Sequence, residues 1–168
     1  MLISKSRDHQ LKRISASEIA EFYEKGIVVA KDLKEAFRYY DYAWSSKGRI
    51  KTGIALLNGI GTEKSAVKAL KKFRDSVRID KSPLGAYYAA VILLSGAENI
   101  APDNKQSVKF LQFAAGKKYI PAMRKLAEIY RNGIEGISVD AKAAAELEVA
   151  ILKTPILPDE YFYGSAHL

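Results

Sequence analysis

The sequence predicts an all-α fold: an α-solenoid of about four helix–loop–helix repeats, followed by a C-terminal capping tail. Three observations predict it. Glycines recur along the 168 residues at spacings of 33, 37 and 37. Small and apolar residues precede each glycine with the 3.6-residue period of a helix, and an Asp or Ser suited to begin a helix follows it. Units of this length bury their apolar faces by stacking on their neighbours. The four glycines are Gly26, Gly59, Gly96 and Gly133.

The stretch before each glycine predicts the first helix of a hairpin. The positions eleven and six residues before the glycine are always small, and the position three before it is Tyr or Leu. These offsets fall on one stripe of an α-helix. We therefore expect a helix that ends where the glycine adopts a left-handed conformation, and whose small residues let a neighbouring helix approach closely. The small residues are Ser15, Gly48, Gly85 and Ala122, then Ala20, Gly53, Ala90 and Ala127; the larger ones are Tyr23, Leu56, Leu93 and Tyr130.

The stretch after each glycine predicts the second helix. A short loop leads to a residue whose side chain can accept hydrogen bonds from the free N–H groups of a first helical turn. Four positions further on the residue is small, and seven or eight further on it is large and apolar. The helix-start residues are Asp32, Ser65, Asp103 and Asp140, and the small residues are Ala36, Ala69, Ser107 and Ala144.

The repeat phase sets the domain organisation. The repeats occupy about residues 15–47, 48–82, 83–119 and 120–151, within one domain over residues 15–151. Residues 1–14 are expected to form an N-terminal arm or a leading helix. In the tail, residues 152–168, two prolines stop the last helix and the run Tyr161-Phe162-Tyr163 follows. This run is expected to fold back on its own chain; docking in a second copy, and thus self-association, is the alternative.

The fourth repeat also carries a pattern known from a family of helical repeats. Residues 122–133 read Ala-Met-Arg-Lys-Leu-Ala-Glu-Ile-Tyr-Arg-Asn-Gly. This resembles the first helix of a Sel-one-like repeat (SLR), whose pattern is Ala, then Leu-Ala or Leu-Gly, then Tyr and Gly. The second repeat is similar at Asn58-Gly59-Ile60-Gly61, whereas Ile100-Ala101-Pro102 replaces the Gly-x-Gly loop in the third. The resemblance covers about residues 15–151. It implies an α-solenoid related to tetratricopeptide repeats that binds other proteins as an adaptor and has no shared catalytic residues.

Composition excludes most kinds of active site. The chain has no cysteine, and its two histidines, His9 and His167, lie near opposite ends. A disulfide framework, a cysteine zinc site and a histidine-based triad are therefore not expected. The loop glycines lack the strand and the lysine of a phosphate-binding loop. We predict a non-enzymatic protein with no metal and no cofactor.

The sequence also contains no run of the roughly 18–20 apolar residues that a membrane span requires. Residues 1–14 lack the apolar centre of a secretory signal. The prediction is a cytoplasmic protein.

Apolar residues on the first helices of the two middle repeats predict a partner-binding groove. The positions five and two before the glycine are charged in the outer repeats but apolar in the middle ones. First helices line the concave face of a solenoid, so these side chains are expected to anchor a peptide or helix of a partner protein. The alternative is that they belong to the core, because middle repeats are flanked on both sides. The predicted contacts are Ile54, Leu57, Tyr87, Tyr88, Val91 and Leu94.

Positive charge provides a second hypothesis. The net charge is +8, and residues 49–82 hold nine basic against three acidic residues. Spacings of three and four place four lysines on one face of the second helix of repeat two. This basic patch, within the stretch Lys64–Arg78, predicts binding to nucleic acid or an acidic partner; the alternative is a solvated outer face. The four lysines are Lys64, Lys68, Lys71 and Lys72.

Four aromatic residues, Tyr39, Tyr40, Tyr42 and Trp44, fall within six positions. At a helical spacing of four, Tyr40 and Trp44 share one face, which is compatible with a binding hot spot. Packing between neighbouring repeats is the favoured interpretation, because aromatic stripes at helical spacing usually serve the core.

Overall fold

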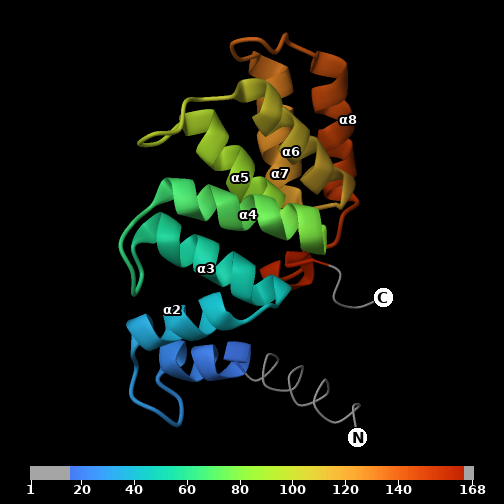
Figure 1. Ribbon diagram of the computed structural model, residues 1–168. Helices are drawn as coiled ribbons and strands as arrows, with labels where there is room; N and C mark the ends of the chain where they lie inside the picture. Colours follow the sequence, from blue (N-terminus) through green and yellow to red (C-terminus); the bar gives the residue numbers. More distant parts are fainter. Residues whose placement is uncertain (1–15, 165–168) are drawn as a thin grey trace, which may run out of the picture. The chain divides into compact units, whose positions relative to one another are not determined.

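The computed structural model describes residues 16–164, and the predicted arm over residues 1–14 lies outside this range (Figure 1). Regular structure in the described part is helical, apart from two isolated β-bridges. Residues 16–25 are helical. The later helices are α2 (Leu33–Tyr42), α3 (Ser46–Asn58), α4 (Ala66–Asp80), α5 (Pro83–Ser95), α6 (Asn104–Gly116), α7 (Ile120–Asn132), α8 (Ala141–Leu152) and the 3₁₀ helix η1 (Asp159–Phe162).

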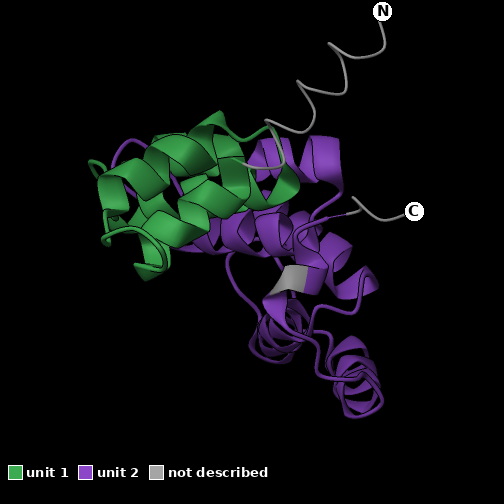
Figure 2. Ribbon diagram, turned by 90° about the horizontal axis from the view of Figure 1, so that it is seen from below, with its two compact units in different colours: residues 1–72 green, residues 73–168 purple. Residues whose placement is uncertain are grey.

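The chain divides into two compact units, and the division falls between Lys72 and Phe73, within α4 (Figure 2). In the first unit α2 packs against α3. In the second unit each helix from α5 to α8 packs against the next in chain order, and η1 returns to α5. Contacts between consecutive helices are the packing pattern of a repeat array.

Each hairpin is closed by the same backbone hydrogen bond. The N–H of the residue that caps the second helix donates to the carbonyl of the residue three before the glycine. The four bonds, from Asp32 to Tyr23, Ser65 to Leu56, Asp103 to Leu93 and Asp140 to Tyr130, measure 3.0, 2.7, 2.8 and 2.7 Å. The four repeat glycines all have the predicted positive φ, between +66° and +73°, but only Gly59 is shown in the left-handed helical region, whereas Gly96 and Gly133 have extended ψ values of 177° and 162°. Because side chains disfavour this conformation, glycine at this position lets the chain turn back at low cost.

The loops between the helices of a hairpin fall into two classes. In the first two repeats the capping residue follows the glycine by six positions, and in the last two by seven. The longer loops each close through an isolated bridge, Ala97 with Ile100 and Ile134 with Ile137. Asn99 and Gly136 occupy the same left-handed position, with φ of +61° and +77°. The third loop, which lacks the Gly-x-Gly pattern, therefore has the geometry of the fourth, because Asn tolerates the left-handed region.

The small residues bring the two helices of each hairpin together. Ala20 and Ala36 are buried with Tyr40 in one cluster of the first unit. In the second unit the Ser107 hydroxyl donates a 2.9 Å hydrogen bond to the Ala90 carbonyl. Both partners of that bond are fully buried. The predicted small stripes are therefore confirmed as helix contacts at these positions, and the one polar member is satisfied.

The tail folds back on its own chain, as expected, but it does not cap the last repeat as predicted, because its contacts lie at the starts of α5 and α7. Phe162 is buried, and its ring centroid lies 4.8 Å from that of Tyr119. The Ser82 hydroxyl donates a 2.8 Å hydrogen bond to the Phe162 carbonyl. The tail docks near the N-termini of α5 and α7, and it leaves the outer face of α8 exposed at Val149 and Leu152.

A pair of glycine substitutions tests how tightly the second loop is packed. Gly59 and Gly61 are both left-handed, but an added Cβ at Gly59 meets only ordinary contacts, whereas at Gly61 it would overlap the backbone of Leu33. Gly59→Ala should lower the free energy of unfolding by about 1 kcal/mol from backbone strain alone. Gly61→Ala should cost about 3 kcal/mol, because strain and overpacking add. Urea denaturation measures both, and equal losses would contradict the contact with α2.

Candidate functional site

In the first unit, α3 supplies the two apolar residues predicted for the groove. Ile54 and Leu57 are half-buried, whereas Ile50, Ala55 and Leu56 on the same helix are buried. Ile54 also lines a small cavity of about 70 Å³ with residues of α2, among them Leu33, Ala36 and Phe37. The core of this unit is therefore completed by other side chains, and Ile54 and Leu57 keep part of their apolar surface in solvent.

A polar cluster that the sequence analysis did not identify lies beside this cavity. The Glu24 carboxylate accepts a 2.6 Å hydrogen bond from the Tyr40 hydroxyl and bonds of 3.0 and 3.1 Å from the Lys51 ammonium. Glu21 forms a second ion pair, with Lys47. The sequence did contain a signal for these ion pairs, because first-helix residues of adjacent repeats carry opposite charges. These pairs join residues 16–25 to α3.

The Glu24 pKa reflects this arrangement. Burial by itself raises the pKa of the carboxyl, but the hydrogen bonds from Tyr40 and Lys51 and the charge of Lys51 outweigh burial, so the pKa lies below its ordinary value. The carboxylate is thus held in its charged form. A lowered pKa suits a structural ion pair and argues against a general acid at this position.

In the second unit, α5 supplies the other four predicted residues, Tyr87, Tyr88, Val91 and Leu94, and all are half-buried. Tyr87 and Tyr88 belong to a continuous chain of aromatic rings. Phe73 stacks on Tyr88 at 4.9 Å, Tyr88 meets Tyr87 at 5.9 Å, and Tyr87 meets Tyr119 edge-on at 5.5 Å. The chain ends at Phe162 of the tail. The two tyrosines are therefore engaged by their own chain, while Val91 and Leu94 are the aliphatic residues of the predicted set on this helix.

The hydroxyls of Tyr88 and Tyr119 are held in their neutral form. Burial raises the pKa of Tyr119 far above its ordinary value, and the nearby charge of Asp159 and a 3.1 Å hydrogen bond to its carboxylate raise it further. Burial also raises the pKa of Tyr88, and the charge of Asp159 adds to the effect. Tyr119 can thus act as a hydrogen-bond donor.

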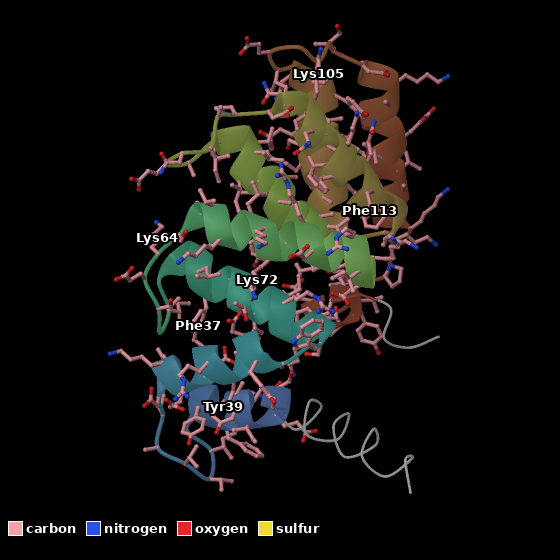
Figure 3. All side chains as sticks on the ribbon, in the orientation of Figure 1. Phe37, Tyr39, Lys64, Lys72, Lys105 and Phe113 are labelled. Atoms are coloured by element: carbon pink, nitrogen blue, oxygen red, sulfur yellow. The ribbon has the colours of Figure 1, made fainter. Side chains whose placement is uncertain are left out.

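The predicted basic patch is less uniform than its spacing indicates. Lys68 and Lys71 are exposed on α4, and Lys64 is exposed in the loop before the helix begins (Figure 3). Lys72 is half-buried, and its ammonium lies 2.5 Å from the Asp41 carboxylate of α2. Lys72 therefore turns toward α2 and leaves three exposed lysines.

The predicted aromatic pair does not share a helix face. Tyr40 is buried and packs within its repeat, whereas Trp44 follows the end of α2 and is 72% exposed. A spacing of four places residues on one face only while the helix continues. Tyr39 instead stacks on Tyr23 at 5.7 Å, on the side of α2 opposite Phe37 (Figure 3).

The described residues show no grouping of three acidic, histidine or cysteine side chains that could hold a metal ion. Among the described helices, none has both the length and the apolar character needed to cross a membrane.

The Sel1 repeat family matches residues 14–43, 46–71, 83–119 and 120–147. The chain belongs to the Sel1 repeat family. Its fold is the predicted all-α solenoid. Sel1 repeats are generally protein–protein interaction modules, and their fold is typically a non-enzymatic scaffold.

Solved structures of Sel1 repeat proteins share the fold. A protective antigen of uropathogenic Escherichia coli that displays an SLR fold aligns with a TM-score of 0.78 and 16% identity over 84% of this chain. A Sel1 repeat protein from Oxalobacter formigenes aligns with a TM-score of 0.75 and 19% identity, also over 84%. This chain spans 30% of the first protein and 56% of the second. No curated protein matches the sequence.

The Glu24 cluster predicts a pH-dependent contribution to stability. Because the folded pKa lies below the ordinary value of 4.5, the cluster stabilises the fold above that pH and the contribution is lost as the pH falls through the folded pKa. Glu24→Gln should lower the free energy of unfolding at pH 7 by about 1 kcal/mol, reduced from the usual value for charged hydrogen bonds by partial exposure.

Urea denaturation at pH 7 and pH 3 measures this effect, with Glu18→Gln as the exposed control on the same helical segment. The difference between the Glu24 variant and wild type should be smaller at pH 3 than at pH 7. A loss of the same size at both pH values would show that the substitution acts through packing rather than charge.

Proposed function

We propose that this chain is a protein-binding module whose partner contacts the apolar side chains of α3 and α5. The observation that carries the proposal is the incomplete burial of Ile54 and Leu57 on α3 and of Val91 and Leu94 on α5. Buried core positions on the same helices are filled by other residues, including Leu56 on α3. Partly exposed apolar side chains on one helix are the usual anchors for a docked segment.

The composition of the outer repeats supports the same proposal. Their first helices carry charged residues in ion pairs at the corresponding positions: Glu24 of the first repeat pairs with Lys51 of the second, and Arg131 of the fourth repeat pairs with Glu148. Ion pairs that keep part of their surface in solvent contribute little free energy to an interface and favour one register over another. The middle repeats would therefore supply the affinity of binding, and the charged outer repeats its orientation.

Introducing a negative charge at these apolar positions tests the proposal. Leu57→Asp or Val91→Asp should reduce partner retention at least tenfold, because a carboxylate cannot enter an apolar contact without a large desolvation cost. The measurement is affinity capture from the host lysate in moderate salt with nuclease present, followed by quantification of each protein retained by wild type. Val67→Asp is the matched control, since Val67 is exposed on α4.

Circular dichroism of the same variants separates binding from folding. Unchanged helix content together with lost retention supports the proposal. Loss of helix content in both variants would show that these side chains belong to the core, and retention of every captured protein by folded variants would contradict the partner surface.

A second candidate function rests on the exposure of Lys64, Lys68 and Lys71, none of which pairs with an acidic side chain in the described part of the chain. Nucleic acid or another polyanion would bind there with strong salt dependence. Between about 50 and 200 mM salt, an interface with three phosphate contacts should lose more than about tenfold in affinity, whereas an apolar interface should change little. The double substitution Lys68→Glu and Lys71→Glu should abolish the salt-dependent binding of a polyanion and leave binding through the apolar residues unchanged.

A further inference from the structure

The tail of this chain shows how a peptide segment is held in the second unit. The Phe162 side chain is buried against Tyr119, the Phe162 carbonyl accepts the Ser82 hydrogen bond, and the Asp159 carboxylate accepts the bond from the Tyr119 hydroxyl. The acidic residue Asp159 and the aromatic residue Phe162 are three residues apart in sequence and are joined by the single turn of η1. An acidic group, an aromatic ring and a backbone carbonyl are therefore three of the contacts that hold the tail, and Gly164 also packs closely against Asp80.

The groups that hold the tail are themselves fixed by their own helices. The Ser82 hydroxyl caps α5 by accepting a 3.0 Å hydrogen bond from the Gly85 N–H. The Tyr119 carbonyl accepts bonds of 3.1 Å from the N–H groups of Ala122 and Met123 at the start of α7. The Tyr119 ring rests on Tyr87. The site is thus assembled independently of the tail, and a preorganised site loses little entropy on binding.

The attachment of the tail permits exchange. Between α8 and η1 the chain runs through Pro155, Ile156, Leu157 and Pro158, all exposed, with Ile156 at 89%. Within η1, Asp159 and Tyr161 are exposed and Phe162 is buried. Release of the tail requires that Phe162 leaves its buried position and that Gly164 leaves its contact with Asp80.

Charge around the site favours an acidic ligand. Lys81 directly precedes Ser82, and Lys117 and Lys118 directly precede Tyr119; all three lysines are exposed. Lys81 and Lys118 hold left-handed backbones, with φ of +55° and +61°. Non-glycine residues in this conformation are strained, and such strain is concentrated at binding sites. The two loops that present the contacts of the tail thus also present three positive charges.

We propose that the tail is an intramolecular stand-in for a partner segment, and that the site formed by Ser82, Tyr87 and Tyr119 binds a peptide of a partner protein in which an acidic residue precedes an aromatic residue by three positions. This inference rests on the proposed protein-binding function but uses a different surface from Leu57. The tail competes with the partner peptide at the high effective concentration that its tether provides. The partner therefore displaces the tail when it binds.

The test uses the full chain and a fluorescein-labelled peptide with the sequence of residues 158–164, followed by fluorescence anisotropy. The peptide should bind Phe162→Ala at least tenfold more tightly than wild type, because the variant releases the competing tail. Peptides with Asn for the Asp, or Ala for the Phe, should bind the variant at least tenfold more weakly. Asp159→Ala, which removes one exposed carboxylate, is the second tail-release variant in case Phe162→Ala lowers helix content, and should give about a threefold gain.

Tyr119→Phe, combined with Phe162→Ala, separates a binding role from a structural one. Without the hydroxyl, the parent peptide and its Asn version should bind equally. Absence of peptide binding to the released variants, or equal binding of all peptides, would overturn the inference. A dimer with exchanged tails, detected by light scattering without peptide binding, would also overturn it. Leu57→Asp should bind the peptide as wild type does, so failure of the proposed function can be distinguished from failure of this site.

Discussion

The structure depends on one hydrogen bond, which is repeated in every hairpin. The N–H of the residue that begins the second helix donates to the carbonyl three residues before the glycine, over 2.7–3.0 Å. The bond requires the chain to reverse within six or seven residues, which the left-handed glycine permits. Once the loop is closed, the direction of the second helix is fixed, and the small residues of both helices must meet. The pairs Ala20 with Ala36 and Ala90 with Ser107 are the result.

Close packing through alanine, glycine and serine has a consequence for the rest of the surface. Small residues bring the helix backbones together, and the larger side chains next to them then remain only half-buried. Charged residues at these positions form ion pairs, as Glu24 does with Lys51. Apolar residues, as at Leu57 and Val91, keep surface in solvent. The lowered pKa of Glu24 is that of a carboxylate that stabilises the fold through its ion pair with Lys51.

The tail of this chain packs against the N-terminal ends of two helices, α5 and α7. Ser82 and Tyr119 each precede the first residue of a helix, and the hydroxyl of each donates a hydrogen bond to the tail. The aromatic chain from Phe73 to Phe162 joins this end to the residues of α5 that were predicted for a groove. The end of α5 and its predicted groove residues therefore lie within one compact unit. Three exposed lysines precede Ser82 and Tyr119 in the sequence.

The sequence by itself determined the repeat phase, the left-handed glycines, the four capping residues and the buried small stripes, because all of these follow from local backbone geometry and from a 3.6-residue period. It also determined the family, through the pattern around Gly133 and Tyr130. Only the tertiary structure decided that Lys72 turns to Asp41, that Trp44 leaves the face of Tyr40, that Glu24 meets Tyr40 and Lys51, and that the tail lies against Ser82 and Tyr119. Each of these contacts joins different elements of the chain or lies just beyond a helix end, where spacing along one helix no longer determines which side chains meet.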